Sequence, residues 1–214
     1  MGIKASSDQF TVIGQTGSGS VAIEATLTLL GLPYRVEEIR HAQFHEYNPM
    51  VQVPVLITPD GERITESAAI LVWLADAHPE AGLAPGIADA GRAQFLRWMA
   101  FVASAIYALY WVRDDPSRVA SEPVARAEVK ARLNQRIADC WGVMEANLVP
   151  GHYLLGDALS ALDVYVTIVS RWTPRDALHQ TIAPRIAEVV RRVEADPRLA
   201  GLLAERFPLT AETD

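Results

Sequence analysis

The sequence has only one cysteine, Cys140, among its 214 residues. One cysteine cannot form an internal disulfide or the thiolate cluster of a structural metal site, and this usage is typical of a reducing, intracellular compartment. We therefore expect a cytoplasmic protein. Cys140 lies on an apolar helical stripe with Ile137, Trp141 and Met144, so we expect a buried packing residue and not a redox centre.

The sequence also lacks an excess of positive charge. It has 19 Lys and Arg residues against 26 Asp and Glu residues, which gives a formal net charge of −7. Phosphate binding needs clustered cations that release counterions, so we expect no nucleic-acid partner. No uninterrupted apolar run reaches the roughly 18 residues of a membrane span, and the start of the chain has no apolar signal-peptide core, so we expect no membrane partner.

The five histidines show no metal-binding spacing. His41 and His45 are four residues apart, but they lie in an irregular stretch that ends at Pro49, where a zinc pair on one helix face is not expected. We predict that the protein holds no metal. Apolar residues make up 50% of the chain and charged residues 21%, which excludes a disordered protein.

The start of the chain alternates between strand and helix patterns. Phe10–Ile13 is a short apolar run, and a Gly/Ser/Thr cluster separates it from residues 21–30, which can form a helix. Gly31 and Pro33 then end that helix, and residues 34–39 alternate as a strand does. This order predicts two parallel strands joined by a right-handed crossover.

The next segment predicts a β-hairpin that leads into a helix. Residues 53–57 have the pattern of a strand, and residues 59–61 (Pro-Asp-Gly) are a strong turn signal. Residues 62–64 are then the short return strand. A helix over residues 68–77 follows. Pro54 has no amide hydrogen to donate, so it belongs at a strand start, an edge or a special turn, and a cis bond before it stays open.

From residue 92 on, the pattern is almost wholly helical. Residues 92–112 and 122–148 each carry an apolar stripe at helical spacing. Ser160 and Asp163 have the spacing of a capping box, which begins a third helix. Two shorter helices are expected over residues 182–195 and 197–206.

Taken together, these features resemble the glutathione S-transferase family, and the resemblance covers essentially the whole chain. Its main carriers are residues 48–56 (Asn-Pro-Met-Val-Gln-Val-Pro-Val-Leu), residues 65–70 (Thr-Glu-Ser-Ala-Ala-Ile), Gly156, Asp157, Ser160 and Asp163. The resemblance implies an α/β plus all-α fold: a thioredoxin-like N-terminal domain followed by an all-helical C-terminal domain. It also implies a homodimer, a cis bond before Pro54 and glutathione as co-substrate.

The domain boundary follows from composition. Residues 82–91 are rich in Pro, Gly and Ala and form the natural linker. Residues 1–81 are then the thioredoxin-like, glutathione-binding domain, and residues 92–214 the helical, substrate-binding domain.

The candidate glutathione-binding residues are Gln52, Val53, Pro54, Glu66 and Ser67. The backbone of Val53, next to the proline, can pair with the cysteinyl part of the tripeptide. Glu66 and Ser67 lie at a helix start, where free amides and the helix dipole favour a carboxylate. By resemblance this is the γ-glutamyl carboxylate, Glu66 meets the nearby ammonium, and Gln52 stands where many members contact glutathione. Taken alone, Ser67 is a plain N-cap and Glu66 a first-turn acid.

The catalytic position departs from the family pattern. The thiolate of glutathione is the nucleophile, and members of the family usually stabilise it with a Tyr, Ser or Cys after the first strand. Here glycines stand at the three positions that the resemblance indicates: Gly14 for the tyrosine type, Gly17 for the serine type and Gly19 for the bacterial cysteine type. We predict Ser18, then Ser20, as the catalytic residue.

Other readings of this loop stay open. Thr16 and the backbone amides of the glycine-rich loop can also hold an anion. Ser20 suits a helix N-cap equally well, and the glycines suit a permissive turn.

Three aromatic residues indicate where a second substrate binds. Tyr107, Tyr110 and Trp111 lie near the end of the 92–112 helix, where the resemblance places an apolar substrate pocket. Aromatic rings with polar tips suit the binding of an electrophile, although helical spacing alone places some of them in the core.

The leading hypothesis is a glutathione transferase, an enzyme that conjugates the thiol of glutathione to a small hydrophobic electrophile. One alternative is a glutathione-dependent disulfide or peroxide reductase, in which bound glutathione carries the chemistry. The other alternative is a non-catalytic binding protein of the same fold. It stays open because the family's usual catalytic positions hold no Tyr, Ser or Cys.

Overall fold

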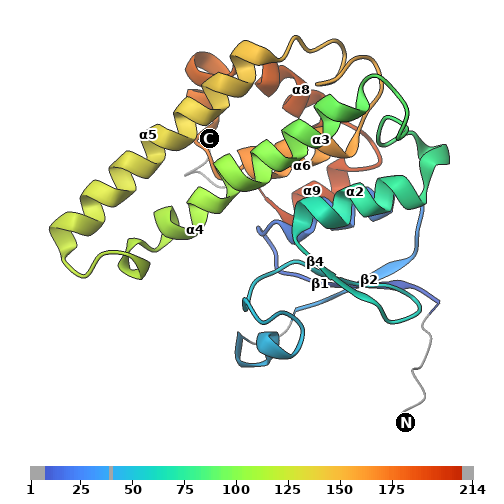
Figure 1. Cartoon of the computed structure of the whole chain (residues 1–214), viewed down its shortest axis with the longest axis horizontal. Coiled ribbons are helices and arrows are strands. Elements are labelled where there is room, and N and C mark those ends of the chain that lie inside the picture. Colours follow the sequence, from blue (N-terminus) through green and yellow to red (C-terminus); the bar gives the residue numbers. More distant parts are fainter. Residues whose placement is uncertain (1–7, 39–40, 209–214) are drawn as a thin grey trace.

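A four-stranded sheet forms one end of the molecule in the computed structural model, which describes residues 8–38 and 41–208 (Figure 1). Its strands are β1 (Phe10–Ile13), β2 (Tyr34–Glu37), β3 (Val55–Ile57) and β4 (Arg63–Thr65), in the order β2-β1-β3-β4. The predicted parallel pairing of β1 with β2 and the antiparallel β3–β4 hairpin are confirmed. The predicted third strand begins two residues late, after a cis Val53–Pro54 bond.

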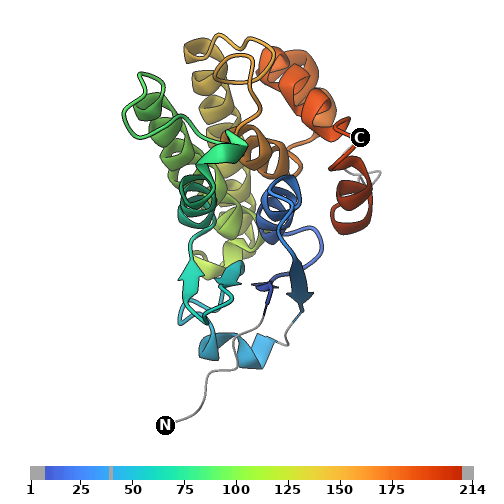
Figure 2. The same cartoon turned by 90° about the vertical axis from the view of Figure 1, so that its right-hand side faces the viewer.

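Two helices cover the face of the sheet that points to the helical half. They are α1 (Ser20–Leu29) and α2 (Ser67–Ala77), and both views show them between the sheet and the remaining helices (Figures 1 and 2). Gly31 adopts a φ of 66° just after α1, the left-handed conformation expected of a glycine there. The short helix η1 (His41–Glu46) lies on the opposite side of the sheet (Figure 2).

The helical half follows a short helix η2 (Pro79–Ala81). Its elements are α3 (Arg92–Phe101), η3 (Val102–Tyr107), α4 (Ala108–Asp114), η4 (Pro116–Arg118), α5 (Pro123–Asn147), α6 (Ala161–Ser170), α7 (Arg175–Ala177), η5 (Leu178–Ile182), α8 (Pro184–Glu194) and α9 (Ala200–Arg206). The five predicted helical segments are present, with shifted ends. The sequence did not predict α7 and η5, nor the π-helical geometry of η3, which joins α3 and α4 into one continuous helix.

One hydrophobic core joins the two halves. The cluster of buried side chains runs from Phe10 in β1 to Phe207 after α9. α6 lies at its centre and packs against α1, α2 and α8, and the capping box that begins α6 at Ser160 and Asp163 is present as predicted. Cys140 is buried in the same core, as predicted, and its burial raises the pKa of the thiol.

The continuous helix over residues 92–114 is long and apolar enough to cross a membrane by length and composition, with a mean hydropathy of 1.4 over its most apolar stretch. The sequence did not suggest such a segment because Arg97 interrupts the apolar run. The helix packs against α5 and α6, and a core helix meets the same criterion.

A largely buried group of charges connects α6 to α8. Arg171, at the end of α6, and Arg175 in α7 each approach the Glu194 carboxylate to 2.9 Å. Burial alone would raise the pKa of Glu194, but the two guanidinium groups outweigh it and lower that pKa below its ordinary value. These three charged residues therefore link α6, α7 and α8.

This lowered pKa predicts an acid-sensitive contribution to stability. A carboxyl whose pKa is depressed in the folded state stabilises the fold above its ordinary pKa of about 4.3. That stabilisation is lost as the pH falls through the lower folded value. Urea unfolding over a pH series should show a Glu194→Gln variant with a shallower acid limb than the wild type; parallel acid limbs would contradict the assignment.

Candidate active site

A cavity of about 690 Å³ lies between the sheet half and the long helix of residues 92–114. Its lining brings together every site residue that the sequence predicts except Ser20: Ser18, Gln52, Val53, Pro54, Glu66 and Ser67 from one side, and Tyr107, Tyr110 and Trp111 from the other. Residues far apart in the sequence therefore share one cavity. The polar start of α2 lies on its sheet side, and most of its aromatic rings lie on its helical side, where Asp114 and Arg118 also line it.

The loop before α1 is held by contacts with the rest of the protein. The Gly17 amide donates to the Arg206 carbonyl at 2.8 Å, and the Trp172 indole N–H donates to the Gly17 carbonyl at 3.1 Å. The Thr16 amide donates to the Glu38 carboxylate at 3.3 Å. Residues from the end of β2 and from the helical half thus fix the position of this loop.

The remaining loop amides also have partners. The Gln15 amide donates to Ser20 Oγ at 3.1 Å, the Ser18 amide to the Gln15 carbonyl at 3.2 Å, and the Ser20 amide to Ser18 Oγ at 3.2 Å. The Gly19 backbone is hydrogen-bonded to the Tyr107 hydroxyl. An anion bound by this loop would therefore have to displace one of these internal acceptors, and its binding there stays a prediction.

The two predicted catalytic serines occupy different environments. Ser18 is partly exposed and lines the cavity, and its hydroxyl donates to the Gln15 carbonyl at 2.7 Å. Ser20 is completely buried, and its hydroxyl lies 3.2 Å from a carboxylate oxygen of Glu24. Ser20 therefore does not face a ligand in the cavity. It is also not the N-cap, because α1 begins at Ser20 and Gly19 precedes it.

The start of α2 forms the polar side of the cavity. Glu66 immediately precedes α2 with a φ of 66°, and Val51, which also lines the cavity, has a φ of 56°. Non-glycine residues rarely adopt this conformation, and when they do they gather at functional sites. Ser67 is buried, and its hydroxyl lies 2.9 Å from the Tyr165 hydroxyl. The first-turn amides of α2 have no acceptor within the helix, which favours an anion there.

The helical half supplies the aromatic side. The Tyr107 ring lies 5.0 Å from Trp172 and 6.2 Å from Tyr165, measured between ring centroids. The Tyr110 hydroxyl lies 2.6 Å from Thr173 Oγ1, so this residue offers its ring to the cavity. Trp111 is 48% exposed, so it stands at the cavity's edge.

Sequence reasoning missed several lining residues. Trp172 and Tyr165 come from α6 and the turn after it, and nothing in their local pattern distinguishes them from core aromatics. Asn48 could have been found, because it begins the motif that carries the family resemblance. Its side chain donates to the Gln52 carbonyl at 2.8 Å and accepts from the Met50 amide at 3.0 Å, which shapes the segment that presents Gln52 and Val53.

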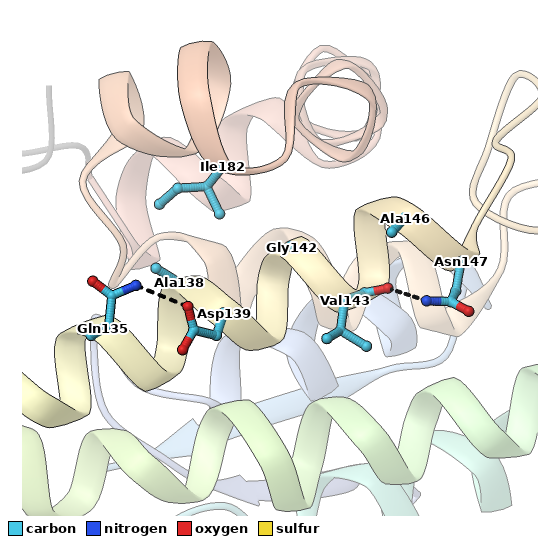
Figure 3. A pocket seen from close by; sticks show the side chains of 8 residues that line it. All are labelled: Gln135, Ala138, Asp139, Gly142, Val143, Ala146, Asn147 and Ile182. Carbon is cyan, nitrogen blue, oxygen red and sulfur yellow. Dashed lines mark hydrogen bonds between the residues drawn. The ribbon is translucent and has the colours of Figure 1, made fainter.

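A second hollow, of about 500 Å³, lies along α5 (Figure 3). Its polar side chains pair within the helix: Gln135 donates to the Asp139 carboxylate and Asn147 to the Val143 carbonyl, both at 2.8 Å. This hollow offers a ligand mainly small and apolar side chains. Among the described residues, no group of three His, Cys, Asp or Glu side chains could hold a metal ion.

Comparison with known proteins shows a consistent similarity to one family. Residues 20–77 match the family model described as glutathione S-transferase, N-terminal domain. The chain is 28% identical over 201 residues to the uncharacterized GST-like protein YncG of Escherichia coli strain K12, covering 90% of this chain and 96% of that protein. Its structure superposes on a glutathione transferase homologue from Sulfitobacter with bound glutathione, with a TM-score of 0.82 and 25% identity over 92% of this chain and 97% of that one. The chain is thus similar to glutathione S-transferases over most of its length, and residues 20–77 match the N-terminal domain of that family.

Another relative shows the range of chemistry within the family. A probable maleylacetoacetate isomerase of Vibrio cholerae is 29% identical, over 80% of each protein. The glutathione S-transferase fold is present as expected, with a thioredoxin-like sheet half followed by helices.

Proposed function

We propose that this protein is a glutathione transferase, which binds glutathione in the cavity and conjugates its thiol to a small hydrophobic electrophile. One observation carries the proposal: a single cavity sets a polar, anion-favouring helix start opposite an aromatic wall. Such an arrangement suits a charged tripeptide on one side and an apolar reactant on the other. In this proposal residues 1–81 bind glutathione, and residues 92–214, beyond the linker at 82–91, bind the electrophile.

Glutathione binding is assigned to the sheet side. The backbone of Val53, next to Pro54, pairs with the cysteinyl part of the peptide, as an added strand would. The α2 start at Ser67 binds the γ-glutamyl carboxylate, and the Glu66 carboxylate binds the ammonium group. Gln52 contributes a further polar contact from the same segment.

The second reactant is assigned to the aromatic side. Tyr110 and Trp111 provide apolar surface for the electrophile, and Ser18 lies at the sulfur end of the peptide. The thiolate sulfur attacks the electrophilic carbon, a C–S bond forms, and the displaced electron pair leaves with the leaving group or moves onto the acceptor. Holding both reactants in one cavity supplies the proximity that speeds this step. We further propose a cytoplasmic homodimer, as the family resemblance implies.

Removing the polar groups at the α2 start should weaken glutathione binding. A Glu66→Ala, Ser67→Ala double variant loses a charged partner and a hydroxyl, so we expect the dissociation constant to rise by at least about 10-fold, since a hydrogen bond to a charged group contributes about 1.5–3 kcal/mol. Isothermal titration calorimetry measures this change, and a thermal melt verifies that the variant is folded.

Glu62→Ala is the matched control, because Glu62 is an exposed acid of the same hairpin that does not line the cavity. Equal affinity of the double variant and the wild type would contradict the carboxylate assignment. Reduction of a disulfide or peroxide in place of conjugation would favour the reductase alternative, and glutathione binding without turnover of either kind would favour a binding protein.

A further inference from the structure

The Tyr107 hydroxyl occupies the place of a missing side chain at the start of α1. Tyr107 is the last residue of the π-helical segment η3, and its ring reaches the loop before α1. A Cβ atom built on Gly19 would lie 2.1 Å from the Tyr107 hydroxyl oxygen and 2.8 Å from the ring carbon that bears it. A side chain at residue 19 and the Tyr107 hydroxyl therefore exclude each other.

The Tyr107 hydroxyl is also still available to donate a hydrogen bond, whereas the neighbouring hydroxyl groups are already paired. The nearby Ser18 hydroxyl donates to the Gln15 carbonyl at 2.7 Å. The Tyr110 hydroxyl is paired with Thr173, and Tyr165 with Ser67. The Tyr107 oxygen accepts from the Gly19 backbone, but its own O–H has no acceptor among residues 8–38 and 41–208.

The environment keeps this hydroxyl protonated. Burial raises the pKa of Tyr107 to about 12, with a smaller contribution from the negative charge of Glu66, although the Gly19 hydrogen bond acts in the opposite direction. At neutral pH Tyr107 is therefore a neutral donor. It lines the same cavity as Val53, whose backbone is assigned above to the cysteinyl part of glutathione.

We propose that Tyr107, from the helical half, donates the hydrogen bond that stabilises the glutathione thiolate, in the space that Gly19 leaves free. This inference rests on the proposed function and adds to it a catalytic residue. The thiol releases its proton to solvent, and the resulting sulfur anion accepts the Tyr107 O–H. When the C–S bond forms, the negative charge leaves the sulfur and Tyr107 keeps its proton throughout.

The direct test is a Tyr107→Phe variant, which removes one oxygen and keeps the ring. The pKa of bound glutathione, followed by the ultraviolet absorbance of its thiolate, should rise by about one to two units, since a hydrogen bond to an ion contributes about that much. At neutral pH kcat/KM should fall by about 10- to 100-fold. The dissociation constant for glutathione should change by less than about 3-fold, because a single hydrogen bond to the un-ionised thiol is weak.

Two further variants sharpen this test. Tyr153→Phe is the matched control, because Tyr153 does not line the cavity, and its thiol pKa should equal that of the wild type. Ser18→Ala should have a smaller effect than Tyr107→Phe. An unchanged thiol pKa in Tyr107→Phe would overturn the inference alone, whereas a wild type that does not bind glutathione would overturn the proposed function and the inference with it.

An independent test adds the missing side chain. Gly19 has φ −63° and ψ −12°, which alanine adopts without strain, so the consequence of Gly19→Ala is the clash with Tyr107. We expect the same rise in thiol pKa as in Tyr107→Phe, and no further rise in the double variant, because both changes remove one interaction. Additive effects, or a wild-type thiol pKa in Gly19→Ala, would contradict the proposal. Gly142→Ala, where an added Cβ meets nothing within 4 Å, is the control for a helical glycine.

Discussion

Replacing Arg206 by alanine should lower the free energy of unfolding by about 3–5 kcal/mol, the cost of leaving a buried charge without its partner. The buried charge is Glu24, in the middle of α1. Its side chain is 1% exposed and lies 2.8 Å from Arg206 Nε. The same guanidinium donates to Thr16 Oγ1 and to Glu38, each at 2.9 Å. One side chain at the end of α9 therefore holds both α1 and the loop before it.

Urea unfolding measures the change, and Arg132→Ala is the matched control. Arg132 pairs with Glu128 at 2.6 Å, and both side chains are more than half exposed, a setting in which ion pairs contribute only about 0–1 kcal/mol. A variant in which Glu24→Leu accompanies Arg206→Met should recover part of the loss, because no buried charge is then left alone. A loss in Arg206→Ala as small as that in Arg132→Ala would contradict the expectation.

This contact also shows what the sequence could not predict about the site. The loop pattern around Gly14, Gly17 and Gly19 was visible, and so was the helix that follows it, because strand, turn and helix signals are local. The groups that hold the loop lie far away along the chain: Trp172 is 155 residues from Gly17, and Arg206 is 190 residues from Thr16. Their positions depend on how the helices pack, which periodicity does not determine.

The glutathione-binding candidates were easier to predict than the catalytic one. Gln52, Val53, Glu66 and Ser67 lie on one continuous stretch around β3 and β4, so the hairpin alone brings them to the cavity. Ser20 was expected to face a ligand, but α1 begins one residue earlier than predicted and its first turn is buried. Tyr107 was expected only as a wall of the substrate pocket, because nothing local connects it with Gly19.

Replacing Asp163, the acid of the α6 capping box, should also lower the free energy of unfolding strongly. Its carboxylate accepts from the Leu154 amide at 2.8 Å, the Ser160 amide at 2.8 Å and the Ser160 hydroxyl at 2.6 Å. Asp163 is 1% exposed. Because α6 packs against both α1 and α2, this side chain orders the helix on which the two halves meet.

An Asp163→Ala variant should lose about 3–5 kcal/mol of unfolding free energy, since each buried donor left without an acceptor costs about 1–3 kcal/mol. Asp163→Asn should lose less. The side-chain oxygen of asparagine still accepts a hydrogen bond, although its NH2 group cannot accept from the remaining donors. Asp157→Ala, at an exposed acid in the same connection, should remain within about 0.5 kcal/mol of the wild type. Urea unfolding ranks the three variants, and equal losses in Asp163→Ala and Asp157→Ala would show that the capping box does not hold α6 against the sheet half.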